Sequence, residues 1–262
     1  AVGLHTLTEG ERFWRGTDLD RLPPDRKREK QLAIQMIFQD PYASLNPRMR
    51  VLDIVGEAPV VHGMVEKGAQ KAYVEDMLVR VGMDPTVLRR FPHQFSGGQR
   101  ARIGIARALA VKPEFLVCDE SVAALDVSIQ AQVLNLFMRL REELNLTYLF
   151  ISHDLGVVKH ISDRVVIMYL GRVVESAPTE EVFAAPNHPY TQALLAEAPK
   201  LEVGKKTYVA IRGEIPSPLN PPTGCHFHPR CPHAMPRCKT EQPVLKEIAP
   251  LRFSACHLND QT

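Results

Sequence analysis

The chain has 262 residues, of which 45% are hydrophobic and 24% charged, a composition that allows a sizeable core without disulfides or metals. Its 32 basic and 30 acidic residues leave a net charge of +2, which disfavours a broad nucleic-acid-binding surface, so no nucleic-acid partner is expected. No apolar run approaches the roughly 18–20 residues that span a bilayer, and the N-terminus lacks a signal-peptide layout. We therefore expect a soluble or peripheral protein that stays in the cytoplasm.

Short apolar runs alternate with helical patterns over the first two thirds of the chain. Residues 1–30 are expected to hold the end of a helix, an antiparallel piece around Gly10 and Gly16, and a polar stretch. The further predicted elements, in chain order, are a strand at 32–38, helices over 51–81 and 99–110, a strand at 115–118, a helix at 129–144, a strand at 147–152, and two strands at 164–168 and 172–175. Such alternation predicts an α/β fold with a mainly parallel sheet.

The texture of the sequence changes beyond about residue 186. Prolines become dense there, and four of the five cysteines lie between 225 and 256. We predict a first domain over 1–185, with a helical subdomain at about 51–110, and a small C-terminal extension over 186–262.

The run Phe95–Gln99 stands at the head of a predicted helix. Ser96, Gly97 and Gly98 expose backbone N–H groups that no large side chain shields, and the helix N-terminus adds partial positive charge. This arrangement suits a phosphate. The alternative interpretation is an ordinary helix cap made by Ser96.

A second pattern is the apolar run 115–118, which closes on two carboxylates, Asp119 and Glu120. At the carboxyl edge of a parallel sheet, where α/β proteins bind their ligands, such a pair suits Mg²⁺ and an attacking water. The alternative interpretation is a strand that simply ends in solvated acids.

Together these runs resemble the ATP-binding subunits of ABC transporters. Ser96, Gly97, Gly98 and Gln99 resemble the signature motif, with Phe95 in place of the usual leucine. The resemblance implies a P-loop NTPase nucleotide-binding domain and, as cofactors, ATP with Mg²⁺.

The same resemblance implies roles for single residues. Asp119 corresponds to the Mg²⁺ ligand of the Walker B motif and Glu120 to the catalytic base. Gln39 corresponds to the Q-loop glutamine that reaches Mg²⁺ and the water, and His153 to the switch histidine at the γ-phosphate. Asp126 corresponds to the D-loop aspartate at the interface between two ATPase subunits.

The sequence departs from the family pattern in three respects. Ser121 stands where proline is usual and Ala123 where serine is usual, which affects fine tuning of turnover. In addition, no G-x-x-x-x-G-K-[ST] phosphate loop occurs in these 262 residues. We expect that the sequence begins inside the helix that follows this loop, rather than that the subunit is naturally degenerate. This polypeptide alone is then expected to bind ATP poorly and to be inactive as an ATPase.

Two further runs resemble the oligopeptide and dipeptide, or peptide/nickel-type, importers, namely residues 40–49 and 187–195. This resemblance implies peptide import, with a related second ATPase in a heterodimer, two membrane permeases and, indirectly, an extracytoplasmic peptide-binding protein. It places the subunit peripherally at the cytoplasmic face of the inner membrane. The alternatives are a soluble ABC ATPase without membrane subunits and a non-catalytic partner that offers only its signature face.

The cysteine cluster of the extension, Cys225, Cys231, Cys238 and Cys256, has gaps of five, six and seventeen residues. In a cytosolic protein such clustering favours a metal over disulfides. Relatives with this extension carry a 4Fe–4S cluster, so iron–sulfur is the first expectation. Zinc, helped by the neighbouring histidines, is the second choice, and unligated cysteines are the alternative. These histidines are His226, His228, His233 and His257.

Overall fold

The computed structural model describes residues 2–3, 5–40, 43–197 and 213–260. The chain divides into two compact units, Ala1–Asp154 and Leu155–Thr262. The domain boundary predicted after residue 185 is based on the change in proline and cysteine content, and it stays a prediction. Within the described ranges, no helix has both the length and the apolar character needed to cross a bilayer.

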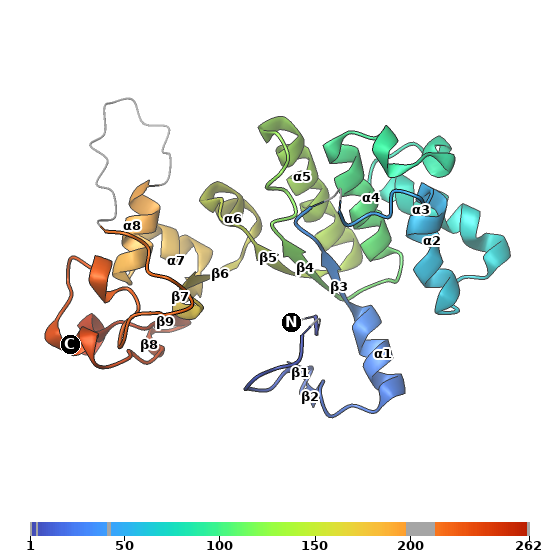
Figure 1. Ribbon diagram of the computed structural model, residues 1–262. Coiled ribbons are helices and arrows are strands. Elements are labelled where there is room, and N and C mark those ends of the chain that lie inside the picture. Colours follow the sequence, from blue (N-terminus) through green and yellow to red (C-terminus); the bar gives the residue numbers. More distant parts are fainter. Residues whose placement is uncertain (1, 4, 41–42, 198–212, 261–262) are drawn as a thin grey trace. The chain divides into compact units, whose positions relative to one another are not determined.

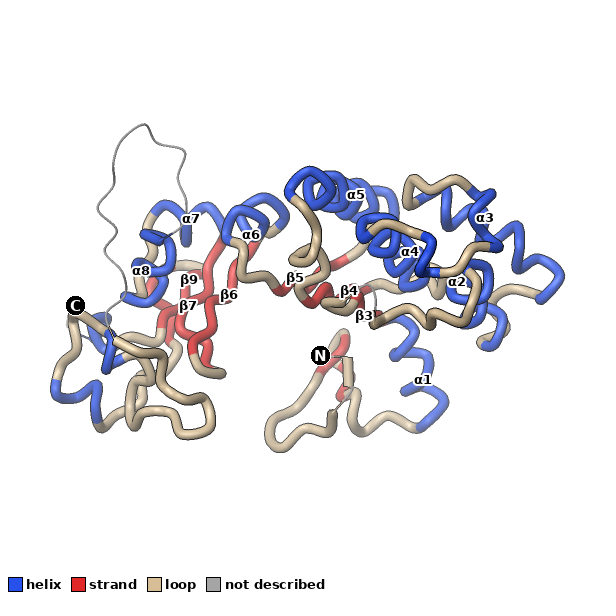
Figure 2. Tube along the Cα trace, turned by 45° about the horizontal axis from the view of Figure 1, so that its top comes forward, coloured by secondary structure: helices blue, strands red, loops and turns tan. Residues whose placement is uncertain are grey.

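The first unit contains a parallel sheet with order β3-β4-β5 and a helical part (Figures 1 and 2). Its elements are β1 (Phe13–Trp14), β2 (Thr17–Asp18), α1 (Pro24–Ala33), β3 (Ile34–Ile37), α2 (Val51–Val61), η1 (Lys67–Ala69), α3 (Gln70–Arg80), η2 (Pro85–Arg89), η3 (Pro92–Gln94), α4 (Gly97–Leu109), β4 (Phe115–Asp119), α5 (Val127–Leu144) and β5 (Thr147–Ile151). The predicted α/β fold with parallel strands is confirmed.

Helices α4 and α5 lie side by side on one face of this sheet (Figures 1 and 2). Phe137 of α5 is fully buried and meets the edges of Tyr148 and Phe150 of β5, at ring centroid distances of 5.6 and 5.7 Å. On the alternate positions of β5, Leu149 and Ile151 are exposed. The period-2 alternation of the strand therefore directs one set of side chains into the helix-covered core.

Both ends of α5 are set by local chemistry. Asp126 precedes the helix, and its side-chain oxygen Oδ1 accepts a hydrogen bond from the backbone N–H of Ile129 at 3.1 Å. Asn145 follows the helix in a left-handed conformation with φ of 51°, which asparagine adopts more readily than most residues. Helix α5 consequently begins and ends beside the two strands that carry the candidate site.

The N-terminal stretch differs from its prediction. At the start of the range 1–30, where the end of a helix is expected, Val2 and Gly3 are not helical, and the φ of Gly3 is 80°, which no right-handed helix accommodates. Residues 1 and 4 lie outside the described residues. The antiparallel piece is confirmed around Gly16, where the two positive φ angles of Arg15 and Gly16 suit a tight hairpin turn. The polar stretch that follows is helix α1, whose first residue is Pro24.

The second unit is built on an antiparallel sheet with order β6-β7-β9-β8. Its elements are α6 (Leu155–Ile161), β6 (Arg164–Tyr169), β7 (Arg172–Pro178), α7 (Thr179–Ala184), α8 (Pro189–Glu197), η4 (His228–Arg230), η5 (Pro236–Lys239), β8 (Lys246–Ala249), β9 (Arg252–Ser254) and η6 (His257–Asp260). The two strands predicted at 164–168 and 172–175 are confirmed as the hairpin β6–β7, which turns at Leu170 and Gly171.

A small core joins this hairpin to the C-terminal part of the chain. Phe227 is 1% exposed and packs edge-on against Tyr169 of β6, with ring centroids 5.3 Å apart. Tyr190 of α8 contacts both rings. Three segments that are distant in the sequence therefore share one aromatic cluster, which holds the cysteine-bearing loops on the sheet.

Candidate active site

The parallel register brings three strand ends together at one edge of the first sheet. Ile37 of β3 lies opposite Cys118 of β4, and Asp119 lies opposite Ile151 of β5. Gln39, Glu120 and His153 each follow within two residues of those ends. The side chains that the sequence places at three separate positions therefore meet at the carboxyl edge, as expected for an α/β site.

Glu120 is the centre of this group. Its Oε2 accepts a hydrogen bond from Gln39 Nε2 at 2.5 Å, and its Oε1 lies 3.0 Å from His153 Nδ1. Each carboxylate oxygen therefore has one partner, and the partners come from opposite sides, one after β3 and one after β5. This bracketing fixes the orientation of the carboxylate before any ligand binds.

The electrostatics of the pair are set by the same contacts. The hydrogen bond to Glu120, followed by the attraction of its negative charge, raises the pKa of His153 above its usual value. The His153 side chain is 70% exposed, so the imidazole remains accessible to a ligand at this edge. Glu120 and His153 can therefore share a proton at a position that solvent or a ligand can reach.

The backbone of Glu120 contributes to its position. Its φ is 43°, in the left-handed region that non-glycine residues rarely adopt, at a cost of about 1–3 kcal/mol. The N–H of Glu120 donates to the carbonyl oxygen of Ile151 at 3.0 Å and so extends the pairing with β5 by one residue. The turn after β4 is therefore held by the neighbouring strand while it directs the carboxylate toward Gln39 and His153.

Asp119 ends strand β4 and is half-buried. Asp119 and Gln39 are the two predicted Mg²⁺ ligands. Among the residues that the structure describes, no three His, Cys, Asp or Glu side chains come close enough to hold a metal by themselves. Since Mg²⁺ usually binds through one or two carboxylates plus water and substrate phosphates, a site of Asp119 and Gln39 fits this cation without a third protein carboxylate.

The signature run forms a capping box at the start of α4. Ser96 Oγ accepts from the N–H of Gln99 at 3.4 Å, and Gln99 Oε1 accepts from the N–H of Ser96 at 3.1 Å. The first N–H groups of α4, those of Gly97 and Gly98, have no partner within the helix ladder and carry the positive end of its dipole. Phe95, which replaces the usual leucine, is buried, so the substitution keeps an apolar anchor.

Glycine at position 98 is required by packing. A Cβ atom there would lie 2.3 Å from Cγ2 of Ile129, in the first turn of α5. The signature run also lies against the D-loop, residues 124–126, because a Cβ atom on Gly97 would be 3.6 Å from Cδ2 of Leu125. Asp126, predicted as an interface residue, is exposed and caps α5 in this subunit.

Two arginines of α4 were not singled out by sequence reasoning. The Nη1 of Arg107 donates to the carbonyl oxygen of Ser44, in the loop after Gln39, at 2.5 Å, and burial lowers the pKa of Arg107. Arg100 is 6% exposed, and its Nε donates to the carbonyl oxygen of Pro92 at 2.8 Å. The available signal was their spacing of seven residues, which puts two arginines on the same face of a helix that is mostly buried.

The four predicted cysteine ligands, Cys225, Cys231, Cys238 and Cys256, line one small cavity in the second unit, together with His228, His233 and His257. Burial raises the pKa of the Cys225 and Cys231 thiols. It also raises the pKa of the Cys256 thiol, to about 11. Within the described part of the chain, no three of these cysteines and histidines form a group that could hold a metal ion in the present arrangement. Cys118, the fifth cysteine, lies in the first unit and is buried in β4.

Comparison with known proteins places these features in context. Residues 2–123 match the family model for ABC transporters, and residues 174–238 match that for the oligopeptide/dipeptide transporter C-terminal region. The oligopeptide transport ATP-binding protein AppF of Bacillus subtilis is 52% identical over 98% of this chain and 79% of its own length. The oligopeptide transport ATP-binding protein OppF of Salmonella typhimurium is 50% identical over 94% of this chain and 75% of its own.

Solved structures show the same fold. A component of the ABC transporter complex cbiONQ from Clostridium perfringens has a TM-score of 0.62 and 26% identity, over 70% of this chain and 72% of its own. An ATP-binding cassette dimer bound to ADP and Pi in a post-hydrolysis state has a TM-score of 0.57 and 26% identity, over 66% of this chain and 74% of its own.

The contact between Gly98 and Ile129 predicts opposite effects of two glycine substitutions in α4. Gly98→Ala is expected to lower the free energy of unfolding by about 1–3 kcal/mol, because the β-branched Ile129 has few rotamers with which to avoid the new methyl group. Gly104→Ala is the control: no atom lies within 4 Å of its added Cβ. It should raise stability by about 0.5–1 kcal/mol through helix propensity. Urea unfolding of both variants checks this, and equal effects would contradict the packing argument.

The Glu120–His153 pair predicts a pH dependence. In metal-free solution, the pKa of His153 measured by NMR should lie above its usual range and fall toward that range in Glu120→Gln. His188, whose pKa burial lowers to about 4, should not respond and serves as the control. Because the folded-state pKa of His153 is raised, its stabilising contribution is present below the ordinary histidine pKa and disappears as the pH rises through the raised one. An unchanged His153 titration in the variant would refute the pairing.

Proposed function

This chain belongs to the ABC transporter family of oligopeptide transport ATP-binding proteins, and from that premise we propose that it powers peptide import through the residues gathered around Glu120. Members of this family are transport-coupled ATPases. The observation that carries the assignment of residues is the Glu120 carboxylate, held between Gln39 and His153 at 2.5 and 3.0 Å.

The proposed reaction is phosphoryl transfer from ATP to water. Water attacks the γ-phosphorus as the bond to the bridging β–γ oxygen breaks, and Glu120 accepts the proton that the water loses. Gln39 and Asp119 would hold Mg²⁺, which would neutralise charge on the phosphates, and His153, on the other side of Glu120, would contact the γ-phosphate. Because both neighbours already bond the carboxylate, the base is oriented without reorganisation at the moment of reaction.

The signature run is proposed to complete a nucleotide site on a second ATPase subunit. Ser96 and Gln99 are exposed at the start of α4, and Ala124 and Asp126 of the D-loop are exposed as well. Val127, the first residue of α5, is 81% exposed. An exposed helix N-terminus binds phosphate, and an exposed apolar side chain next to it suits a protein partner. A related ATPase in a heterodimer is the partner that we propose.

Arg107 supports coupling to membrane subunits. It binds the loop after Gln39 through the carbonyl of Ser44 and lies on the same helix as the signature run. We propose that a change at Gln39 is transmitted to α4 through this hydrogen bond to the half-buried guanidinium of Arg107. We propose that this loop and the helical part over 51–110 contact two permeases at the cytoplasmic face of the membrane, with a peptide-binding protein on the far side.

For the C-terminal extension, proposed to span 186–262, we infer an iron–sulfur cluster at the four cysteines, with zinc as the second choice. The support is their shared cavity, which four histidines also line, and the expected cytosolic setting, which would disfavour disulfides. The cluster would act as a structural staple for loops that contain little regular secondary structure.

Because these 262 residues contain no G-x-x-x-x-G-K-[ST] loop, the role of Glu120 is tested in the assembled transporter reconstituted in vesicles, with an ATPase subunit that carries this loop. Glu120→Gln is expected to lower ATP hydrolysis by about 10²–10⁴-fold, the usual contribution of a general base, while nucleotide binding is retained. Glu114→Gln is the matched control, because Glu114 is exposed, pairs with Arg15 and lies at the opposite end of β4. Turnover in Glu120→Gln equal to that of the control variant would overturn the assignment.

The cysteine cluster is tested by anaerobic purification followed by metal analysis. Wild-type protein should show visible absorbance and bound iron, and Cys238→Ser should lose both. Cys118→Ala, which removes the thiol buried in β4, should retain them. A colourless protein with stoichiometric zinc would show that the site holds zinc instead of an iron–sulfur cluster. A protein without either metal would show that the cysteines are unligated.

A further inference from the structure

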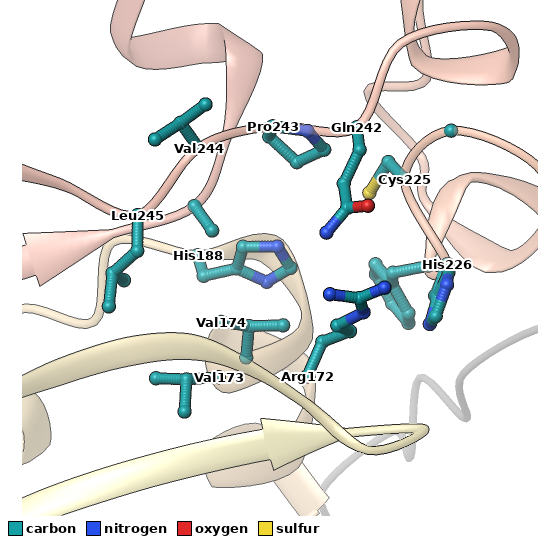
Figure 3. Close-up of a pocket in the computed structure, with 13 residues that line it drawn as sticks. Arg172, Val173, Val174, His188, Cys225, His226, Gln242, Pro243, Val244 and Leu245 are labelled. Atoms are coloured by element: carbon teal, nitrogen blue, oxygen red, sulfur yellow. The ribbon is translucent and has the colours of Figure 1, made fainter. Parts of the chain in front are cut away.

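The second unit contains a larger cavity beside the cysteine cavity, with a volume of about 510 Å³ (Figure 3). Its walls are the start of β7, the loop 224–227, the segment 242–245, His188 and Ala255. All of these belong to the unit Leu155–Thr262, and none belongs to the Glu120 site. The volume lies within the range of roughly 300–1,000 Å³ that is usual for small-molecule sites.

The floor of this cavity is apolar and rigid. Val174 and Ala255 are 7% and 6% exposed, and Phe227 is held by the aromatic cluster with Tyr169 and Tyr190. Because these side chains are fixed by the core of the unit, the cavity does not depend on a mobile side chain for its shape. An apolar group placed here would be removed from water at little cost in ordering the protein.

Polar groups converge above this floor. In Figure 3 the side chains of Arg172, Gln242 and His188 point toward one another across the cavity. Arg172 makes no ion pair within the part of the chain that the structure describes, and no Asp or Glu is among the residues that line the cavity. The cavity therefore presents one uncompensated positive charge.

His188 is prepared as a hydrogen-bond donor. Its Nδ1 accepts from the N–H of Tyr190 at 3.0 Å, which leaves the ring proton on Nε2. Burial lowers the pKa of His188 to about 4, so the ring is neutral at neutral pH. The backbone N–H of His188 is held by the buried carboxylate of Glu175 at 2.8 Å, which fixes the residue at the cavity wall.

We propose that this cavity binds a small organic carboxylate with an apolar body. The guanidinium of Arg172 matches a carboxylate in charge and in its two parallel donors, and Gln242 and His188 add neutral donors. The apolar floor accepts the body of the ligand. A cation would meet Arg172 without a compensating carboxylate, and a multiply charged anion would face only one positive charge above an apolar surface.

The test is calorimetric titration of the full chain with a panel of N-acetyl-leucine, N-acetyl-phenylalanine and hexanoate. Each is compared with its uncharged amide, which has the same body without the charge, and with acetate, which has the charge without the body. At least one carboxylate should bind saturably. Its amide and acetate should each bind at least roughly tenfold more weakly, because the amide loses a charge-assisted hydrogen bond and acetate loses the apolar contact.

Variants place the binding in this cavity. Arg172→Gln should weaken binding of the carboxylate by about tenfold or more. Because Arg172 is exposed, the melting temperature of this variant should match that of the wild type. Lys239→Gln is the control, an exposed cation of the same unit that does not line the cavity. The proposal is overturned if no member of the panel binds, if amide and carboxylate bind equally, or if Arg172→Gln and Lys239→Gln behave alike.

Discussion

The parallel register of β3, β4 and β5 is the constraint on which the candidate active site depends. Gln39, Glu120 and His153 lie far apart in the sequence, and only in-register pairing puts their strand ends at one edge. A shift of one residue in either pairing would turn the alternating side chains to the opposite face and separate the Glu120 carboxylate from one of its partners. The strained turn at Glu120 is tolerated because β5 holds its N–H.

Helix α4 links this edge to the surface offered to a partner. Its first turn carries the signature run and touches α5 through Gly98, while Arg107 near its last turn holds the loop after Gln39. The two functional ends are thus connected by one rigid element rather than by flexible loops. This arrangement connects the loop after Gln39, a proposed Mg²⁺ ligand, to the signature run through contacts of a single helix.

The second unit is held together by an antiparallel sheet and a small aromatic core. Its antiparallel sheet draws β9 and β8 from the C-terminal part onto the β6–β7 hairpin, and Phe227 closes a small aromatic core. Loops rich in proline and cysteine are held against that core and leave two adjacent cavities, one lined by thiols and one by Arg172 and His188. A small core of this kind supports a cluster or a ligand well, because either one adds interactions that the loops themselves lack.

From the sequence alone, the family, the α/β class and the side chains that meet at the strand ends could be predicted, because short motifs and hydrophobic periodicity are local properties. Charged residues at the end of an apolar run indicate a strand edge wherever that strand lies. The roles of Gln39, Glu120 and His153 remain proposals that the geometry supports. What only the tertiary structure decided are the contacts between distant segments: the steric need for Gly98 against Ile129, the grip of Arg107 on Ser44, and the cavity at Arg172. The physical reason is that packing and register depend on which surfaces meet, and local sequence carries no record of the surface on the other side.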